Sequence, residues 1–226
     1  MNTLAVIIGR QGSKRIKNKN FKNFCGKSAI EWSIDAAENA KIFDKIIVST
    51  DKQRSEIKNK KVLKYILFNR PKNISKDSTS TNQAIQHSIK WIEKNFGLPK
   101  YVCCIYACSP LILYQDINKA FKIIKNKNWN FVSTATKYHY PIERSFKIKK
   151  NLSIKMNNVK NYFKNTQLFE DNYHDAGQFY WGKTDAWQKN KKFFDKNSTI
   201  LSLPPNRVHD IDTIEDWKTA TEIFKR

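Results

Sequence analysis

The chain has 226 residues, of which 40% are apolar and 13% aromatic, and it carries a formal net charge of +22. This length suits one domain with a buried core, and neither a run of roughly 20 apolar residues nor a secretory signal is present, so we expect a cytoplasmic protein without a membrane partner. Lysine supplies all but seven of the positive charges and is dispersed among asparagines. Because proteins that recognise nucleic acids favour clustered arginine, we expect no nucleic-acid partner. A basic nucleic-acid-binding protein is kept as the alternative function outside the enzymes.

Apolar segments alternate with segments of helical periodicity along the first 136 residues. Strands are predicted at residues 4–8, 45–49, 62–67, 102–105 and 131–136, and helices at residues 28–40, 81–96 and 115–125. Because strands separated by helices of this length form βαβ units, the pattern predicts an α/β fold with a mostly parallel sheet.

The regular alternation stops at residues 138–172, which are polar and irregular, with weak strand signals at 146–148 and 152–155. It resumes with strands predicted at 178–181 and 199–203 and a closing helix at 214–225. We therefore expect a single domain over residues 1–226 with an excursion at about 138–175. An excursion of this length is too long for an idle loop in a compact domain, and we expect it to build a homodimer.

Four cysteines stand at positions 25, 103, 104 and 108, three of them in one strand-like segment. Their spacing fits neither a zinc ribbon nor a disulfide framework. We interpret them as small core residues in a reducing compartment.

A cationic stretch, IIGRQGSKRIKNKN at residues 7–20, follows the first predicted strand. In open α/β sheets ligands bind at the carboxyl ends of the strands, which is where this stretch must lie. Its glycines allow close backbone approach, and its N–H groups and cations are suited to a triphosphate, although the P-loop spacing is absent. The alternative is solvated surface in a lysine-rich chain.

A pair of carboxylates stands in the stretch HDIDT, residues 209–213. In extended backbone Asp210 and Asp212 share a face, and two carboxylates on one face repel each other unless a cation compensates. Mg²⁺ commonly takes one or two carboxylates together with substrate phosphates. The alternative is a helix start, with Asp212 or Thr213 as N-cap and Thr213 with Asp216 as a capping box, and both interpretations can hold together.

The order of the motifs GRQGSKRIKNKN, VSTD, RP, TST, CSP and DIDT resembles that of the CMP-sugar synthetases, the cytidylyltransferases that activate eight- and nine-carbon sugar acids. The resemblance extends over residues 4–217. It implies a Rossmann-like nucleotidyltransferase fold of the GT-A-like type, with helices on both faces of the sheet. The stretch YHDAGQFYWGK, residues 173–183, resembles the members that activate pseudaminic acid more than those that activate sialic acid or KDO.

The activity that the resemblance implies is transfer of CMP from CTP to the 2-hydroxyl of a nonulosonic acid, with release of pyrophosphate. It implies pseudaminic acid as substrate, Mg²⁺ or Mn²⁺ as cofactor, a homodimer, and a role in surface glycan or flagellin glycosylation. Sialic, legionaminic and KDO-type acids are the alternative substrates.

The resemblance also assigns roles to individual residues. It implies CTP contacts from Arg10, Ser13, Lys14, Lys19, Asn20, Arg70, Ser80 and Thr81. It implies catalytic roles for Arg10, Lys14, Lys19, Asp210 and Asp212, of which the two aspartates hold the metal. It implies that the sugar pocket is formed by Tyr106, Gln167, His174, Gln178 and Tyr180, and that the excursion mediates dimerisation, with Phe193 and Phe194 reaching the partner's site.

The chain departs from the family pattern at three places. Ile8 and Gly9 stand where a proline and an alanine are frequent, and Tyr106 stands where a glutamine is frequent. Asn165 stands where pseudaminic-type members tend to have an arginine, so either another cation replaces that arginine, with Lys164 as the candidate, or the sugar differs. Because residues 178–181 are predicted to be a strand, alternate side chains share a face, and we expect Gln178 to face the sugar together with Tyr180.

Overall fold

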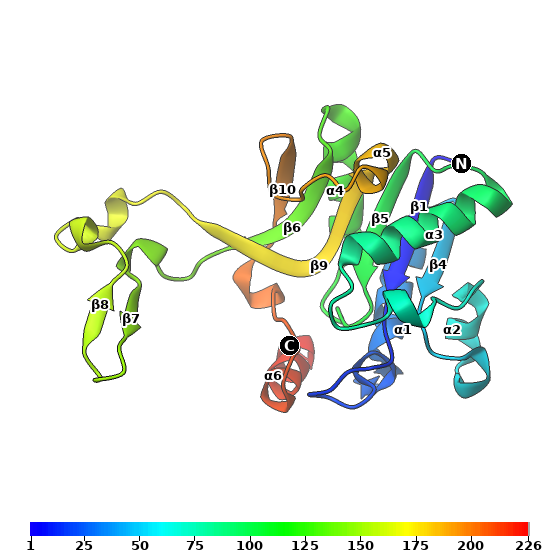
Figure 1. The fold of residues 1–226 in the computed structure, drawn as a ribbon, viewed down its shortest axis with the longest axis horizontal. Coiled ribbons are helices and arrows are strands. Elements are labelled where there is room, and N and C mark those ends of the chain that lie inside the picture. The colour runs from blue at the N-terminus through cyan, green and yellow to red at the C-terminus, as the bar shows by residue number, and fades with distance from the viewer. Residues whose placement is uncertain (226) are drawn as a thin grey trace.

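The computed structural model describes residues 1–225 and contains a six-stranded sheet with the strand order β10-β6-β9-β5-β1-β4 (Figure 1). The strands are β1 (Thr3–Ile8), β4 (Lys45–Ser49), β5 (Tyr101–Tyr106), β6 (Phe131–Lys137), β9 (Tyr173–Lys183) and β10 (Ser198–Ser202). All neighbouring pairs are parallel except those of β9, which runs antiparallel to β5 and β6. The expected mostly parallel α/β sheet is confirmed.

Helices cover both faces of this sheet. They are α1 (Ala29–Ala40), α2 (Lys60–Tyr65), α3 (Thr81–Phe96), α4 (Tyr114–Asn126) and α5 (Thr184–Gln188). Helix α6 (Ile214–Lys225) lies apart from these faces and packs against Phe24 and Trp32 in a third buried cluster. One buried apolar cluster joins α1, α2 and α4 to the sheet, and a second joins α3 and α5 to its other face. Alternate strand residues belong to the two clusters, for example Ala5 and Ile7 to the first and Leu4 and Val6 to the second.

Short elements complete the chain, and several of them lie near the carboxyl ends of the parallel strands. The two small hairpins are β2 (Asn23–Phe24) with β3 (Lys27–Ser28), and β7 (Phe146–Ile148) with β8 (Ile154–Met156). The single 3-10 turns are η1 (Lys19–Phe21), η2 (Arg54–Glu56), η3 (Lys72–Ile74), η4 (Ile142–Arg144), η5 (Val159–Asn161), η6 (Thr166–Leu168) and η7 (Pro205–Arg207).

Side-chain caps define where helices α1 and α3 begin. Ser28 and Glu31 form a capping box at the start of α1, and Ser80 and Gln83 form one at the start of α3. Each box satisfies backbone N–H groups that have no partner within the helix. The chain direction into α3 is therefore specified locally at Ser80.

The strand expected at residues 62–67 is wrong, because this segment forms helix α2 and its exit. The Asn59 side chain caps the helix by accepting a hydrogen bond from the Val62 backbone N–H. The buried residues Val62, Tyr65 and Ile66 are spaced three and four apart, which is a helical period. A short apolar segment without alternation does not distinguish a strand from a single buried helical turn.

Residues 138–172 extend far from the sheet and end in the β7–β8 hairpin (Figure 1). The two weak strand signals are confirmed as this hairpin, in which Ile148 pairs with Ile154 and Lys147 with Lys155. Ile148 and Ile154 are 68% and 66% exposed, so the apolar side of the hairpin has no cover in the isolated chain.

Every helix within residues 1–225 is too short or too polar to cross a membrane. All four cysteines carry free thiols, and Cys103 and Cys104 are fully buried in β5.

Candidate functional site

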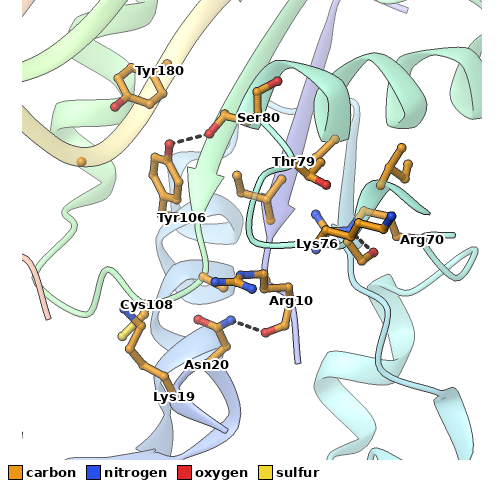
Figure 2. Close-up of a pocket in the computed structure, with 18 of the residues that line it drawn as sticks. Arg10, Lys19, Asn20, Arg70, Lys76, Thr79, Ser80, Tyr106, Cys108 and Tyr180 are labelled. Atoms are coloured by element: carbon orange, nitrogen blue, oxygen red, sulfur yellow. Dashed lines mark hydrogen bonds between the residues drawn. The ribbon is translucent and has the colours of Figure 1, made fainter. Parts of the chain in front are cut away.

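A cavity of about 400 Å³ opens at the carboxyl ends of β1 and β5, as expected for a parallel sheet (Figure 2). Three parallel strands end together here, because Ile8 pairs with both Ser49 and Tyr106. The residues expected from the sequence that line the cavity are Arg10, Lys19, Asn20, Arg70, Ser80, Thr81, Tyr106, Tyr180 and Asp210. Segments up to 200 residues apart in the chain therefore meet at one site.

The loop after β1 follows the floor of the cavity closely. Asn20, which is buried, donates a hydrogen bond of 2.8 Å to the Arg10 backbone carbonyl and so closes the loop upon itself. A Cβ atom on Gly9 would lie 2.7 Å from the Cβ of Ala107, so a larger residue would force the loop away from β5. The close approach of Ala107 thus explains why Gly9 stands where the family frequently has an alanine.

Arg70 is a buried cation on the wall of this cavity. It is 6% exposed, and its Nε donates to the Ser75 hydroxyl at 3.1 Å. Among residues 1–225, no carboxylate lies within 4 Å of its guanidinium, and burial lowers the pKa of Arg70 below the usual value. A buried charge is costly unless it is paired, so this guanidinium is suited to an anion delivered by a ligand.

The two aspartates of the HDIDT stretch have different surroundings. Asp212 accepts from Arg15 at 2.8 Å and from Lys19 at 3.3 Å. Asp210 lines the cavity. Burial and the adjacent Asp212 carboxylate raise the pKa of Asp210, and the positive charge of Lys19 offsets this rise only in part. Asp210 therefore has a charge that its protein neighbours do not fully compensate.

The alternative role of this segment as a helix start is realised by other residues. Thr213 Oγ1 accepts from the Asp216 N–H at 3.1 Å, and Asp216 accepts from the N–H groups of Asp212 and Thr213 at 3.0 and 2.7 Å. The expected capping box of Thr213 and Asp216 is confirmed. The side chains of Asp210 and Asp212 do not take part in it and remain available to the cavity region.

A second cavity of about 360 Å³ lies beside the first and shares Arg10, Lys19 and Asn20 with it. It contains the expected residues Ser13 and Lys14. The cationic loop thus faces two adjacent cavities. The seven side chains assigned to phosphate and metal binding from the sequence line one or both of them: Arg10, Ser13, Lys14, Lys19, Asn20, Asp210 and Asp212.

Two tyrosines form the opposite side of the first cavity from Arg70 and Lys76 (Figure 2). Tyr106 Oη lies 2.7 Å from Thr81 Oγ1, and Tyr180 donates to the Asp175 carboxylate. Burial raises the pKa of Tyr106, and burial together with the neighbouring Tyr106 and Asp175 raises that of Tyr180. Both phenols are therefore neutral at physiological pH and can act as hydrogen-bond donors.

The expectation that Gln178 faces the cavity together with Tyr180 is wrong. Gln178 is buried and donates to the Arg207 carbonyl at 2.8 Å, while Asp175, Gly177 and Tyr180 line the cavity. The pairing of β9 with β6 shifts register here, and Gly177 adopts a φ of +59° with its N–H bonded to Asp175. This bulge breaks the alternation on which the expectation depended.

The other residues assigned to the sugar lie outside the cavity in the single chain. Gln167 lies at the base of the excursion in a separate hollow, and exposed His174 bonds the Asp175 backbone carbonyl. Phe193, which was expected to reach the partner's site, packs within its own chain and stacks on Tyr180 with ring centroids 5.0 Å apart. Phe194, assigned the same role, is 57% exposed.

Several residues of the site were not singled out from the sequence. Lys76 lies beside Arg70 on the cavity wall, Cys108 follows β5 with a pKa that burial raises to about 12, and Asp77 pairs with Arg10 and Lys14. The sequence did offer one signal for Lys76 and Asp77, because they lie between two segments already assigned to the site, the Arg70-Pro71 pair and the Ser80 cap. Asp175 and Gly177 had no signal, because only the bulge turns them toward the cavity.

Comparison with known proteins gives matches over the whole chain. A family model described as cytidylyltransferase matches residues 4–220. The pseudaminic acid cytidylyltransferase of Campylobacter jejuni strain 81-176 is 37% identical over 230 residues, which cover 100% of this chain and 97% of that protein. The N-acylneuraminate cytidylyltransferase B of Danio rerio is 27% identical, over 96% of this chain and 50% of that protein.

Among solved structures, CMP:2-keto-3-deoxy-manno-octonic acid synthetase complexed with CTP matches with a TM-score of 0.67 and 13% identity, over 100% of this chain and 99% of that one. At this identity the match shows a shared fold. Together with the family model and the relative that is 37% identical over the full length, these findings show that the chain belongs to the cytidylyltransferase family.

Proposed function

We propose that this protein transfers CMP from CTP to the 2-hydroxyl of a nonulosonic acid, with pseudaminic acid as the preferred sugar, and releases pyrophosphate. The observation that carries the proposal is the buried guanidinium of Arg70, which faces the cavity without an ion-pair partner among residues 1–225. An anionic nucleotide is the kind of ligand that would compensate this charge. The 37% identity with a pseudaminic acid cytidylyltransferase supports the same activity.

The two sides of the cavity suit the two substrates. Arg10, Lys19, Arg70 and Lys76 provide positive charge for the triphosphate. The tyrosine side provides neutral hydroxyls for the sugar. Ser80 and Thr81, at the start of α3, lie between the two and are assigned to the nucleoside.

The sugar 2-hydroxyl oxygen gives its proton to solvent and attacks the α-phosphorus in line. The bond between the α-phosphorus and the oxygen that bridges it to the β-phosphorus breaks, and pyrophosphate leaves with the electron pair. Such a reaction needs little covalent participation by the protein, so positioning and charge neutralisation supply most of the rate. Lys14, Lys19 and Arg10 neutralise the leaving pyrophosphate.

We assign Mg²⁺ or Mn²⁺ to Asp210 and Asp212. Among residues 1–225, no group of three or more His, Cys, Asp or Glu side chains is placed to hold a metal, and these two carboxylates are the ligands that we assign to the protein. Two carboxylates with substrate phosphates form a frequent Mg²⁺ site, and the raised pKa of Asp210 indicates a carboxylate that would gain from a cation. Asp210 and Asp212 would hold the ion, which would supply neutralisation of charge at the α-phosphate.

Recognition of the sugar acid is assigned to Tyr180 and Asp175. Tyr180 donates to Asp175, so the pair offers a carboxylate that accepts from N–H or O–H groups of the sugar and that repels a second carboxylate. This arrangement orients the sugar with its own carboxylate toward the cationic side. A site that must satisfy hydrogen bonds discriminates between sugars more strongly than apolar contact alone.

We further propose a homodimer formed through residues 138–175. A two-stranded hairpin is marginal by itself, and the exposed apolar side of β7 and β8 would gain cover from a second copy. In such a dimer Gln167 and Phe194, which lie outside the cavity of their own chain, are assigned to the partner's site.

The proposed activity is tested by pyrophosphate release with each of the four ribonucleoside triphosphates, with and without pseudaminic acid. We expect release only with CTP and sugar together, and none after EDTA. Equal release with ATP, or release from CTP without sugar at the same rate, would contradict the proposal.

A further inference from the structure

Asp77 holds the first two cations of the loop that follows β1. Its Oδ1 forms an ion pair with Arg10 Nη1, and its Oδ2 lies 2.7 Å from Lys14 Nζ. Each carboxylate oxygen thus takes one cation. Both cations belong to the set that the proposed function assigns to the triphosphate.

Asp77 reaches these cations from a different loop. It stands between η3 and α3, 67 residues from Arg10 along the chain, and its side chain is 49% exposed. Hydrogen bonding by Lys14 and Arg10 lowers the pKa of Asp77 below its usual range, so the carboxylate is charged at neutral pH. A charged carboxylate whose two oxygens each contact one cation resembles a phosphate group, because both offer two anionic oxygens as hydrogen-bond acceptors.

We propose that Asp77 is a placeholder for phosphate, which occupies Arg10 and Lys14 in the empty enzyme and competes with the triphosphate of CTP and with the product pyrophosphate. This inference rests on the proposed function. Arg10 and Lys14 cannot bind Asp77 and a phosphate fully at the same time, and an Asp77 that stayed in place would repel the incoming anion. Binding therefore requires the exchange of one anion for another.

The exposure of the three side chains keeps this competition weak. Lys14 is 81% exposed and Arg10 38%, and ion pairs of this kind contribute little because water and salt screen them. Asp77 thus orders the loop without blocking the substrate. We expect its charge to weaken pyrophosphate binding by about three- to tenfold, the range that two exposed ion pairs allow.

The test is titration of inorganic pyrophosphate into the protein by calorimetry at low salt in EDTA, with CTP as a second titrant. The variant is Asp77→Asn, which keeps the size of the side chain and removes its charge. The matched control is Asp185→Asn, because Asp185 is also 49% exposed, also lies near two lysines, Lys191 at 3.4 Å and Lys189 at 3.7 Å, and lies at the opposite end of β9 from the cavity.

We expect Asp77→Asn to bind pyrophosphate three- to tenfold more tightly than the parent, with Asp77→Glu close to the parent and Asp185→Asn unchanged. Pyrophosphate binding by Asp77→Asn that is equal to or weaker than that of the parent, with CTP still bound and turned over, would overturn the placeholder role alone. Failure of every variant and of the parent to bind CTP or pyrophosphate, both in EDTA and in a repeat titration with Mg²⁺, would instead overturn the proposed function.

Discussion

The ammonium of Lys19 lies 3.3 Å from the carboxylate of Asp212 and donates a hydrogen bond of 2.5 Å to the carbonyl of Ile211. These residues are more than 190 positions apart in the chain. Their contact joins the cationic loop after β1 to the segment that carries the two aspartates. The groups assigned to phosphate and to metal are therefore positioned as one unit.

The contact distinguishes Lys19 from its neighbour Lys17 in the same loop. Lys19 is 22% exposed and lines both cavities, whereas Lys17 is exposed and lines neither. We expect Lys19→Ala to lower kcat/KM for CTP by about 10²-fold, because a positioned donor to developing charge is lost. Lys17→Ala is the matched control and is expected to retain the parent rate in the same steady-state assay. Equal losses in both variants would show that only the overall charge of the loop matters.

The aspartates are expected to separate into a catalytic pair and a cap. Asp210→Asn and Asp212→Asn should each lower kcat by about 10²-fold if they hold the metal. Asp216→Asn should mainly lower the melting temperature, by about 2–4 °C, because it weakens the cap of α6. Steady-state kinetics and thermal melts of the three variants check this. Near-normal kcat in both Asp210→Asn and Asp212→Asn would remove the metal assignment.

We expect Arg70 to contribute to CTP binding, while the burial of its charge lowers the stability of the folded protein. Arg70→Met removes a buried charge that has no ion-pair partner among residues 1–225, so the melting temperature should not fall. The KM for CTP should rise about tenfold or more, because a charge-assisted contact to the nucleotide is lost.

Arg54→Met is the control for that substitution, because Arg54 donates to backbone carbonyls near α2 and lines neither cavity. It should leave the KM for CTP unchanged. An unchanged KM in Arg70→Met, measured by varying CTP at saturating sugar, would count against a role of Arg70 in binding.

The β7–β8 hairpin provides a matched pair of variants for the dimer. Ile148 and Ile154 form one cross-strand pair on its apolar side, and Lys147 and Lys155 form the adjacent pair on the other side. The double substitution of both isoleucines by aspartate should convert a dimer into a monomer in sedimentation velocity at micromolar concentration. The same substitution of both lysines should leave the dimer intact. A parent protein that sediments as a fully active monomer would contradict the proposed dimer.

A carboxylate on α1 should contribute to the pH dependence of stability. Burial opposes ionisation of Asp35, but hydrogen bonds from Lys27 and Lys61 outweigh it and lower the pKa of Asp35 below the usual value of 3.8. The stabilisation is therefore present above about pH 4 and is lost as the pH falls through the lowered pKa.

We accordingly expect Asp35→Asn to melt about 2–4 °C below the parent at pH 7 and at nearly the same temperature as the parent near pH 2, since exposed partners limit the effect to about 1 kcal/mol. Thermal melts by circular dichroism over this pH range measure the difference. A difference that stays constant down to pH 2 would show that Asp35 acts through packing.

The sequence predicted correctly those helices and strands whose ends are specified by local residues, such as a capping serine. Helix α3 begins and ends where the sequence predicted, because Ser80 caps it and apolar residues recur at helical spacing up to Phe96. Helix α2 was missed because its single turn of buried residues is too short to show a period. The part of the phosphate side formed by residues 10–20 was predictable, because these residues are contiguous in one loop. Lys76 lines the same cavity from another loop and was missed.

The sugar side was only partly predictable, since it depends on pairing between distant segments. The bulge in β9 depends on the register of β6 and turns Asp175 and Tyr180, but not Gln178, to the cavity. The ion pair of Asp77 with Arg10 spans 67 residues and depends on how two loops fold back over the sheet. Neither relationship leaves a periodic trace in the sequence.

The proposed activity and its substrate are tested together by one competition experiment. Limiting CTP is incubated with the protein, Mg²⁺ and equal amounts of pseudaminic, sialic, legionaminic and KDO acids, and the CMP-sugars formed are quantified by mass spectrometry. We expect CMP-pseudaminic acid to be the dominant product. A dominant CMP derivative of another acid would contradict the substrate assignment, and the absence of any CMP-sugar would contradict the proposed activity itself.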